Sequence, residues 1–305
     1  MMSLISRGCV CASDQVSILK VVRRQPGLAD REVSSGALRS AVCLVAGSRQ
    51  PGGALALGLS LFRSRGSVAM AASVSEVEQV LQQPQWPEKS PYSAKDFERF
   101  DESSDTIFYN SPRFVTHIDD HAIAALTKYY GEVLPPSGTA DAAVLDLCSS
   151  WISHYPKGYQ AGKITGLGMN EAELSRNEVL TDYVVHDLNV DAALPFEDNT
   201  YDVITNTVSV DYLSKPMEVF KEMHRVLKPG GLAVMSFSNR CFPTKAIAIW
   251  TSTGDADHAW IVGSYFHYSV PGGWTDPAAK DISPKPSFFG KTDPMYVVFA
   301  RKKDA

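Results

Sequence analysis

Small polar and acidic side chains follow short apolar runs of this sequence, at the points where buried strands are expected to end. In open α/β sheets, ligands bind beyond the carboxyl ends of the strands, so side chains at these points are placed to hydrogen-bond a polar ligand. The candidate binding residues of this kind are Asp146, Cys148, Ser149, Ser150, Asn170, Asp187, Asn206 and Thr207.

No residue pattern predicts a fixed catalytic group. Asp211, His154 and His267 remain open as proton acceptors, although polar residues of these types are more often structural. Cys148 has no evident partner histidine other than His154, which argues against nucleophilic catalysis. The histidines and cysteines show no convincing metal-ligand spacing, so we expect no metal site.

The elements that position these side chains alternate along the chain from residue 143 onward. Predicted strands cover residues 143–147, 163–167, 183–186, 201–207, 233–237 and 295–301, the last as an antiparallel edge strand. Predicted helices cover residues 74–82, 117–130, 171–177, 217–227, 245–250 and 259–265. Alternating strands and helices or helical turns imply an α/β protein with a mostly parallel sheet covered on both faces.

The segment 194–237 shows most clearly why these elements form. Val219, Met223 and Val226 recur at helical spacing, which predicts an amphipathic helix between two apolar strands. Pro229 cannot continue that helix, and the two glycines after it permit a left-handed exit.

In this segment, Leu-Pro-Phe precedes the first strand and Lys-Pro-Gly-Gly follows the helix. The pattern closely resembles the second half of class I S-adenosylmethionine-dependent methyltransferases of the small-molecule type, which include the quinone-biosynthesis methyltransferases. The resemblance spans residues 105–302 or so. It implies a doubly wound, mostly parallel, seven-stranded Rossmann-like sheet with an N-terminal helical extension. It also implies S-adenosylmethionine as the cofactor and a small molecule as the methyl acceptor.

The resemblance assigns the loop after the first strand of this domain to the amino-acid end of the cofactor. Asp146 matches the family's acidic residue, whereas Cys148, Ser150 and Ile152 occupy three positions that are glycine in the family. Glycine there allows close approach of the backbone and a positive φ. Two interpretations are open: a rebuilt loop whose serines and backbone amides still bind the cofactor, or a pocket that is partly filled by Trp151 and no longer binds it.

The resemblance also assigns contacts to the nucleoside. The acid that ends the family's second strand and accepts hydrogen bonds from the ribose aligns with Gly168. Asn170 is therefore either a substitute ligand in a reshaped turn or only a helix cap. Asp187 takes the place of the residue that accepts from the adenine amino group, with Leu188 donating through its backbone.

After the next predicted strand, Asn206 and Thr207 would flank the transferring methyl group in such an enzyme. Tyr109 and Arg113 precede the helix predicted at residues 117–130 and are placed to close over the cofactor. Arg113 either pairs with the cofactor carboxylate or is an ordinary surface charge.

Composition divides the chain of 305 residues into three parts. Residues 1–72 hold nine basic and three acidic residues, a net charge of +6, so the rest of the chain carries −11 of the total of −5. This leader is predicted to be a disordered transit peptide for the chloroplast stroma, with the mitochondrion as the alternative. Residues 73–115 form an extension or linker, and residues 116–305 form the methyltransferase-like domain. The acidic remainder argues against a nucleic-acid partner, and no apolar run is long enough for stable membrane insertion.

These observations predict methyl transfer from S-adenosylmethionine to an unidentified small molecule. The alternative is a binding or scaffold protein that keeps the fold without turnover. A dinucleotide-binding oxidoreductase is less favoured, because no Gly-x-Gly-x-x-Gly follows the first strand.

Overall fold

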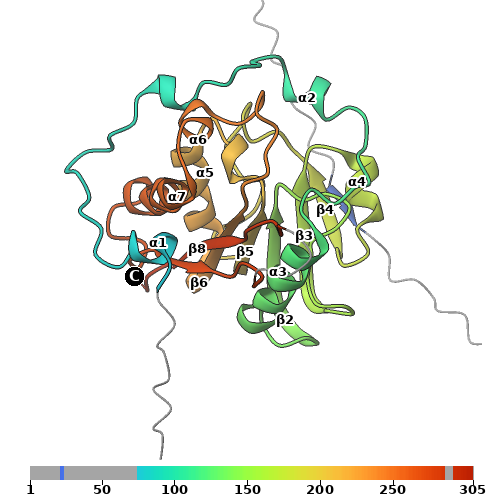
Figure 1. Ribbon diagram of the computed structural model, residues 1–305. Helices are drawn as coiled ribbons and strands as arrows, with labels where there is room; N and C mark the ends of the chain where they lie inside the picture. Colours follow the sequence, from blue (N-terminus) through green and yellow to red (C-terminus); the bar gives the residue numbers. More distant parts are fainter. Residues whose placement is uncertain (1–20, 24–73, 286–290, 305) are drawn as a thin grey trace, which may run out of the picture. The chain divides into compact units, whose positions relative to one another are not determined.

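The apolar runs of the sequence pair as a central sheet in the computed structural model, which describes residues 21–23, 74–285 and 291–304 (Figure 1). Five strands are parallel neighbours, because each is joined to the next by a crossover that returns the chain to the same edge. These five strands are β2 Thr139–Leu147, β3 Ala161–Gly168, β4 Asp182–Val185, β5 Tyr201–Thr207 and β6 Leu227–Phe237.

The strand order is β1-β4-β3-β2-β5-β6-β8-β7, so the order reverses between β2 and β5. Strand β8 (Tyr296–Arg301) is antiparallel, as predicted, but it does not form the edge, because β7 (Ala278–Asp281) pairs with its outer side. At the other edge, β1 (Val21–Arg23) pairs antiparallel with β4. A strand inside residues 1–72 was not expected, and the other residues of this predicted leader lie outside the described part of the chain.

The helices follow their sequence signals with shifted ends. Asp119 caps the first long helix by accepting a hydrogen bond from the Ala122 N–H. The helix before the Lys-Pro-Gly-Gly motif stops at Val226, and Gly230 takes a φ of +74°, the left-handed conformation that was predicted. The helices are α1 Glu76–Gln79, α2 Asp105–Phe108, α3 Asp120–Val133, α4 Glu171–Arg176, α5 Pro216–Val226, α6 Ala248–Thr251 and α7 Asp255–Ser269. None of the helices in the described part of the chain is long and apolar enough to cross a bilayer.

The connection between β2 and β3, residues 148–160, contains no helix, contrary to the expected alternation. Pro156 lies in this connection and would remove the N–H that a helix needs. Tyr155 and Tyr159 are buried here and cover the sheet in place of a helix. The Tyr155 hydroxyl also shares a hydrogen bond of 2.6 Å with Thr205 of β5. The long connection between β4 and β5 likewise has no helix.

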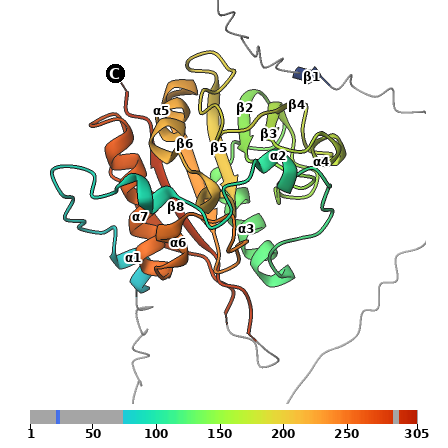
Figure 2. The same ribbon diagram turned by 90° about the horizontal axis from the view of Figure 1, so that it is seen from above.

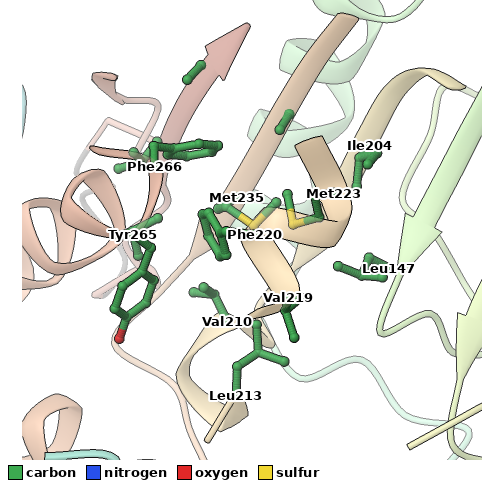
Figure 3. Packing of buried hydrophobic residues seen from close by; sticks show 14 of the residues in the cluster. Leu147, Ile204, Val210, Leu213, Val219, Phe220, Met223, Met235, Tyr265 and Phe266 are labelled. Atoms are coloured by element: carbon green, nitrogen blue, oxygen red, sulfur yellow. The ribbon is translucent and has the colours of Figure 1, made fainter. Parts of the chain in front are cut away.

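Both faces of the sheet are buried, because side chains alternate along each strand. Leu147, Ile204 and Met235 point to the face covered by α5 and α7. Val144 and Val203 point to the opposite face, which packs against α3. Figure 3 shows the first face, where Phe220 of α5 lies beside Tyr265 and Phe266 of α7.

The chain between α1 and α3 passes over one end of the sheet, as the two views in Figures 1 and 2 show. Residues 93–117, which are part of this segment, are called the strap below. It includes α2 and holds the residues predicted to close over a ligand. The carboxyl ends of the parallel strands lie beneath it.

Candidate functional site

A cavity of about 350 Å³ lies at the carboxyl ends of the parallel strands, where the strand order reverses. Each of the five parallel strands contributes a residue at or just after its end: Cys148, Gly168, Asp187, Thr207 and Cys241. This is the place at which open α/β sheets bind ligands. The cavity volume lies within the range of about 300–1,000 Å³ that is typical of small-molecule sites.

The loop after β2 keeps a glycine-like backbone although it has no glycine. Cys148 has a φ of +59°, and the Ser149 N–H donates to the Leu167 carbonyl of β3 at 2.7 Å. His154 and Val208, which also line the cavity, have φ values of +57° and +44°. Left-handed backbone costs a non-glycine residue about 1–2 kcal/mol, and such strain gathers at functional sites. At Cys148 the loop therefore takes a backbone conformation that favours glycine, whereas Ser150 and Ile152 do not have a positive φ.

Asp146 holds this loop from below. Its side chain is 2% exposed and accepts hydrogen bonds from the hydroxyls of Ser149 (2.6 Å), Ser153 (2.6 Å) and Thr205 (3.2 Å). Burial raises the pKa of the Asp146 carboxyl to about 6, and the three hydroxyls oppose that rise. Asp146 and Ser149 thus position the loop by bonding to each other.

Trp151 forms part of the cavity wall and does not fill the cavity. Its indole N–H donates to the Val115 carbonyl at 3.1 Å, and its ring meets that of Phe114 edge to face. Ile152 lies in the same wall, and the cavity extends past both residues to Asp187. The geometry therefore favours a rebuilt loop over a blocked pocket.

At the end of β3, Asn170 acts as a helix cap. Its side-chain oxygen accepts from the Glu173 N–H at 3.1 Å, and its amide nitrogen donates to the Tyr109 carbonyl at 2.7 Å. Asn170 lines the cavity, but its amide is committed to joining α4 with the strap.

The turn after β4 places Asp187 and Leu188 in the cavity wall, as predicted. The Asp187 Oδ1 atom accepts from the N–H groups of Asn189 (2.9 Å) and Val190 (3.3 Å), so this side chain shapes the turn. Its Oδ2 atom has no hydrogen-bond partner among the described residues. The carboxylate can therefore form the turn and still accept a hydrogen bond from a ligand.

The two candidates at the end of β5 differ in role. Asn206 is 0% exposed and donates to the Leu147 carbonyl at 3.2 Å, and it does not line the cavity. Its amide nitrogen therefore joins β5 to β2, and a contact between Asn206 and a ligand stays a prediction. Thr207 does line the cavity, and its hydroxyl shares a hydrogen bond of 2.7 Å with that of Tyr130.

The strap supplies the other wall through Tyr109, Arg113 and His117. Arg113 is not an ordinary surface charge: its guanidinium lies 4.4 Å from the ring centroid of Phe108 and 5.6 Å from that of Phe242. It also donates to the Phe108 carbonyl at 2.9 Å. These contacts hold a cation at the cavity wall, where it can attract an anionic ligand group.

A buried cluster of charges anchors the strap. Asp105 is 6% exposed and accepts from Arg99 at 2.7 Å and from Asn189, in the turn after β4, at 2.8 Å. Lys245 is 1% exposed and lies 3.3 Å from the Asp105 carboxylate. Asp105 therefore ties the strap both to the turn that holds Asp187 and to the segment after β6.

Sequence reasoning missed Glu173, which is 8% exposed and lines the cavity. The only signal was its position three residues after Asn170, where a helix-capping pattern often has a glutamate. Of the three proton-acceptor candidates, only His154 lines the cavity. Burial lowers the pKa of His154 to about 4, and its Nδ1 atom is buried without a hydrogen-bond partner. His267 instead stacks on a tryptophan elsewhere, with 5.0 Å between the ring centroids.

Asp211 is buried next to Tyr212 of the cavity wall, and the effect of this burial on the pKa of its carboxyl can be tested. Burial raises the pKa of its carboxyl from 3.8 to about 8, and its Oδ2 atom has no hydrogen-bond partner. Between these pH values the folded protein keeps a proton that the unfolded chain releases, so wild-type stability falls as pH rises. Asp211→Asn does not titrate. Its stability relative to wild type should rise by about 1 kcal/mol or more between pH 5 and 8.5.

Urea unfolding at several pH values measures this difference, and Asp276→Asn, at an exposed carboxylate, is the control. A pH-independent difference between Asp211→Asn and wild type would contradict the buried, protonated carboxyl.

The known proteins to which parts of this chain are similar in sequence are described as methyltransferases. Residues 147–235 match the model of a methyltransferase domain family. A ubiquinone/menaquinone biosynthesis C-methyltransferase from Ruegeria sp. is 42% identical over 72 residues, 23% of this chain and 28% of the relative. A demethylmenaquinone methyltransferase from Staphylococcus haemolyticus is 36% identical over 97 residues, 30% of this chain and 41% of the relative. The chain thus spans less than half the length of these curated relatives. An S-adenosylmethionine-dependent methyltransferase from Mesorhizobium loti has a TM-score of 0.39 at 16% identity, covering 58% of this chain and 98% of that chain.

The matched segment runs from the end of β2 to β6 and includes the loop and turns that line the cavity. The strand order, with antiparallel β8 between β6 and β7, agrees with the fold that the sequence resemblance implied. Residues 147–235 are therefore similar to a methyltransferase domain, and they contain the ends of β2 to β5 that line the cavity.

Proposed function

We propose that the protein binds S-adenosylmethionine in this cavity and transfers its methyl group to a small molecule. The observation that carries the proposal is the cavity at the reversal of strand order, bordered by a loop with glycine-like backbone and by Asp187. The loop after β2 would hold the amino-acid end of the ligand, and the turn after β4 would hold its adenine.

The polar groups of the cavity fit such a ligand. Arg113 offers a cation to its carboxylate, and the Oδ2 atom of Asp187 and the N–H of Leu188 can pair with the adenine edge. The bound sulfonium supplies an activated methyl group. The chain therefore has to orient the acceptor and exclude water, and it needs a base only for an acceptor that loses a proton.

The acceptor would enter beside Phe242 and Arg240, which follow β6 at the cavity wall. The Phe242 ring meets those of Phe108 and His117 edge to face, with centroids 5.3 and 5.4 Å away. Aromatic faces beside cationic groups suit a planar, electron-rich acceptor with a hydroxyl or anionic group. Two curated relatives are named as methyltransferases of quinone biosynthesis, and a demethylated quinol is the first acceptor to assay.

His154 is placed to orient a hydroxyl of that acceptor. Because burial lowers its pKa to about 4, its imidazole is neutral at pH 7 and can accept a hydrogen bond.

Calorimetry tests ligand binding directly. We expect S-adenosylmethionine and S-adenosylhomocysteine to bind and NAD not to bind. Asp146→Ala should weaken binding of S-adenosylhomocysteine about tenfold, because two hydroxyl hydrogen bonds that shape the loop, from Ser149 and Ser153, are lost. Unchanged affinity in this variant would contradict the assigned pocket.

The rival functions predict different calorimetric results. A scaffold protein without cofactor would bind none of the three ligands, and an oxidoreductase would bind NAD. Transfer of a labelled methyl group to a demethylated quinol then separates an enzyme from a protein that only binds cofactor. Binding without transfer to any small-molecule acceptor would leave the scaffold as the better description.

We also propose import into the chloroplast stroma, with the mitochondrion as the alternative. The net charge of +6 in residues 1–72 supports this proposal. A fluorescent protein fused after residue 72 tests it: stromal fluorescence is expected, and fluorescence that stays in the cytosol would contradict it.

A further inference from the structure

The end of β3 has no room for a side chain. A Cβ atom added to Gly168 would lie 2.1 Å from the Ser149 carbonyl oxygen and 3.2 Å from Leu174 Cδ2. Because the Ser149 N–H bonds to the Leu167 carbonyl at 2.7 Å, the loop after β2 is fastened against β3 at this point. In doubly wound folds, a carboxylate near the end of the second strand often binds the ribose of a nucleotide. Here the rebuilt loop occupies that place.

Glu173 brings a carboxylate to the same part of the cavity from the first turn of α4. Its Oε1 atom accepts from the backbone N–H of Arg113 at 2.7 Å, and its Oε2 atom accepts from the Ser150 hydroxyl at 2.6 Å. The Asn170 cap fixes its backbone. The carboxylate is therefore held in one orientation between the loop, the strap and α4.

This carboxylate still has unused acceptor capacity. Each carboxylate oxygen has two acceptor sites, and each Glu173 oxygen uses one of them. Two oxygens with one site each match the two neighbouring hydroxyls of a ribose. Two other carboxylates at the cavity are committed elsewhere, because Asp105 pairs with two buried cations and Asp146 accepts from three hydroxyls. Asp187 has one oxygen in the turn after β4 and one that is assigned above to the adenine, so it has no pair of free acceptors for the ribose.

We propose that Glu173 is the ribose-binding residue, accepting hydrogen bonds from the 2′- and 3′-hydroxyls of a bound adenosine ligand. The role has moved from the strand end to α4 because the loop after β2 closes the space above Gly168. This assignment rests on the proposed function, since it requires an adenosine ligand in the cavity.

The test compares two ligands and a hydroxyl-deleted analogue by calorimetry. S-adenosylhomocysteine carries ribose and an amino-acid end, 5′-methylthioadenosine carries ribose without that end, and 2′-deoxy-5′-methylthioadenosine lacks one hydroxyl. Glu173→Gln should bind the first two about tenfold more weakly than wild type. Removing the 2′-hydroxyl should weaken binding to wild type and change binding to Glu173→Gln much less.

The matched control is Glu178→Gln, which changes an exposed glutamate just after α4. This variant should bind all ligands as wild type does. Glu173→Asp, which keeps the charge but shortens the reach, is measured beside it, and thermal unfolding checks that each variant is folded.

The outcomes are distinguishable. If wild type binds none of these ligands, the proposed function fails and this assignment fails with it. Suppose instead that wild type binds these ligands and that both Glu173→Gln and Glu173→Asp bind 5′-methylthioadenosine as tightly as wild type does. Only the ribose assignment is then overturned. The same holds if these variants lose affinity for S-adenosylhomocysteine alone, because the carboxylate would then contact the amino-acid end.

Discussion

Replacing Asp105 with alanine is expected to lower the free energy of unfolding by about 3–5 kcal/mol, the cost of breaking a buried ion pair from one side. Asp105 is the shared partner of two cations, Arg99 at 2.7 Å and Lys245 at 3.3 Å. The side chains of these cations are 7% and 1% exposed, so water cannot readily solvate them once the carboxylate is gone. Urea unfolding measures the loss.

Asp101→Ala is the matched control. Asp101 also lies near Lys245, at 3.2 Å, but its side chain is 36% exposed, so water replaces it and a much smaller loss is expected. Asp105→Ala should in addition weaken binding of S-adenosylhomocysteine, because Asp105 ties the strap to Asn189. Equal stability losses in the two variants would show that the buried cluster does not anchor the strap.

Restoring an acid at the end of β3 should impair the protein. Gly168→Asp is expected to lower the free energy of unfolding by about 3 kcal/mol, the upper end for overpacking, because its Cβ would meet backbone only 2.1 Å away. The loop after β2 would have to move away from β3, and the Ser149–Leu167 hydrogen bond would break. We expect affinity for S-adenosylhomocysteine to fall about a hundredfold, the equivalent of the same free energy.

Calorimetry and thermal unfolding measure the two effects of Gly168→Asp. Gly254→Asp makes the same chemical change where no atom lies within 4 Å of the added Cβ, and it should leave both quantities close to wild type. Tighter ligand binding by Gly168→Asp would mean that the strand end still holds the ribose, and it would also contradict the role proposed for Glu173.

The regular elements were predictable where one local pattern decides them. The helical spacing of Val219, Met223 and Val226 predicted α5, and all three side chains are 0% exposed. Gly230, near the start of β6, has the predicted left-handed conformation, and its φ of +74° would be strained in a residue with a side chain. Short-range sterics and hydrophobic periodicity are properties of the sequence itself, so these predictions needed no knowledge of distant contacts.

Strand pairing at the edges of the sheet was not predictable in this way. The run at residues 278–281 shows little hydrophobic alternation, yet it pairs with β8 and displaces it from the edge. No helix forms between β2 and β3, and the sequence did not show that buried tyrosines of residues 148–160 would cover the sheet there. Both features depend on which surfaces the rest of the chain leaves to be covered.

The sequence by itself determined the order of β2 to β6 along the chain, the helices α3 and α5, and the placement of Asp187 and the loop at Cys148 after strand ends. Only the tertiary structure decided which polar side chains remain available to a ligand. The side-chain nitrogen of Asn206 bonds to a carbonyl of β2 away from the cavity, whereas Glu173 lines the cavity and the Ser149 backbone leaves no room for a side chain at Gly168. Hydrogen-bond commitments of this kind are made between residues far apart in the chain, and local spacing carries no information about them.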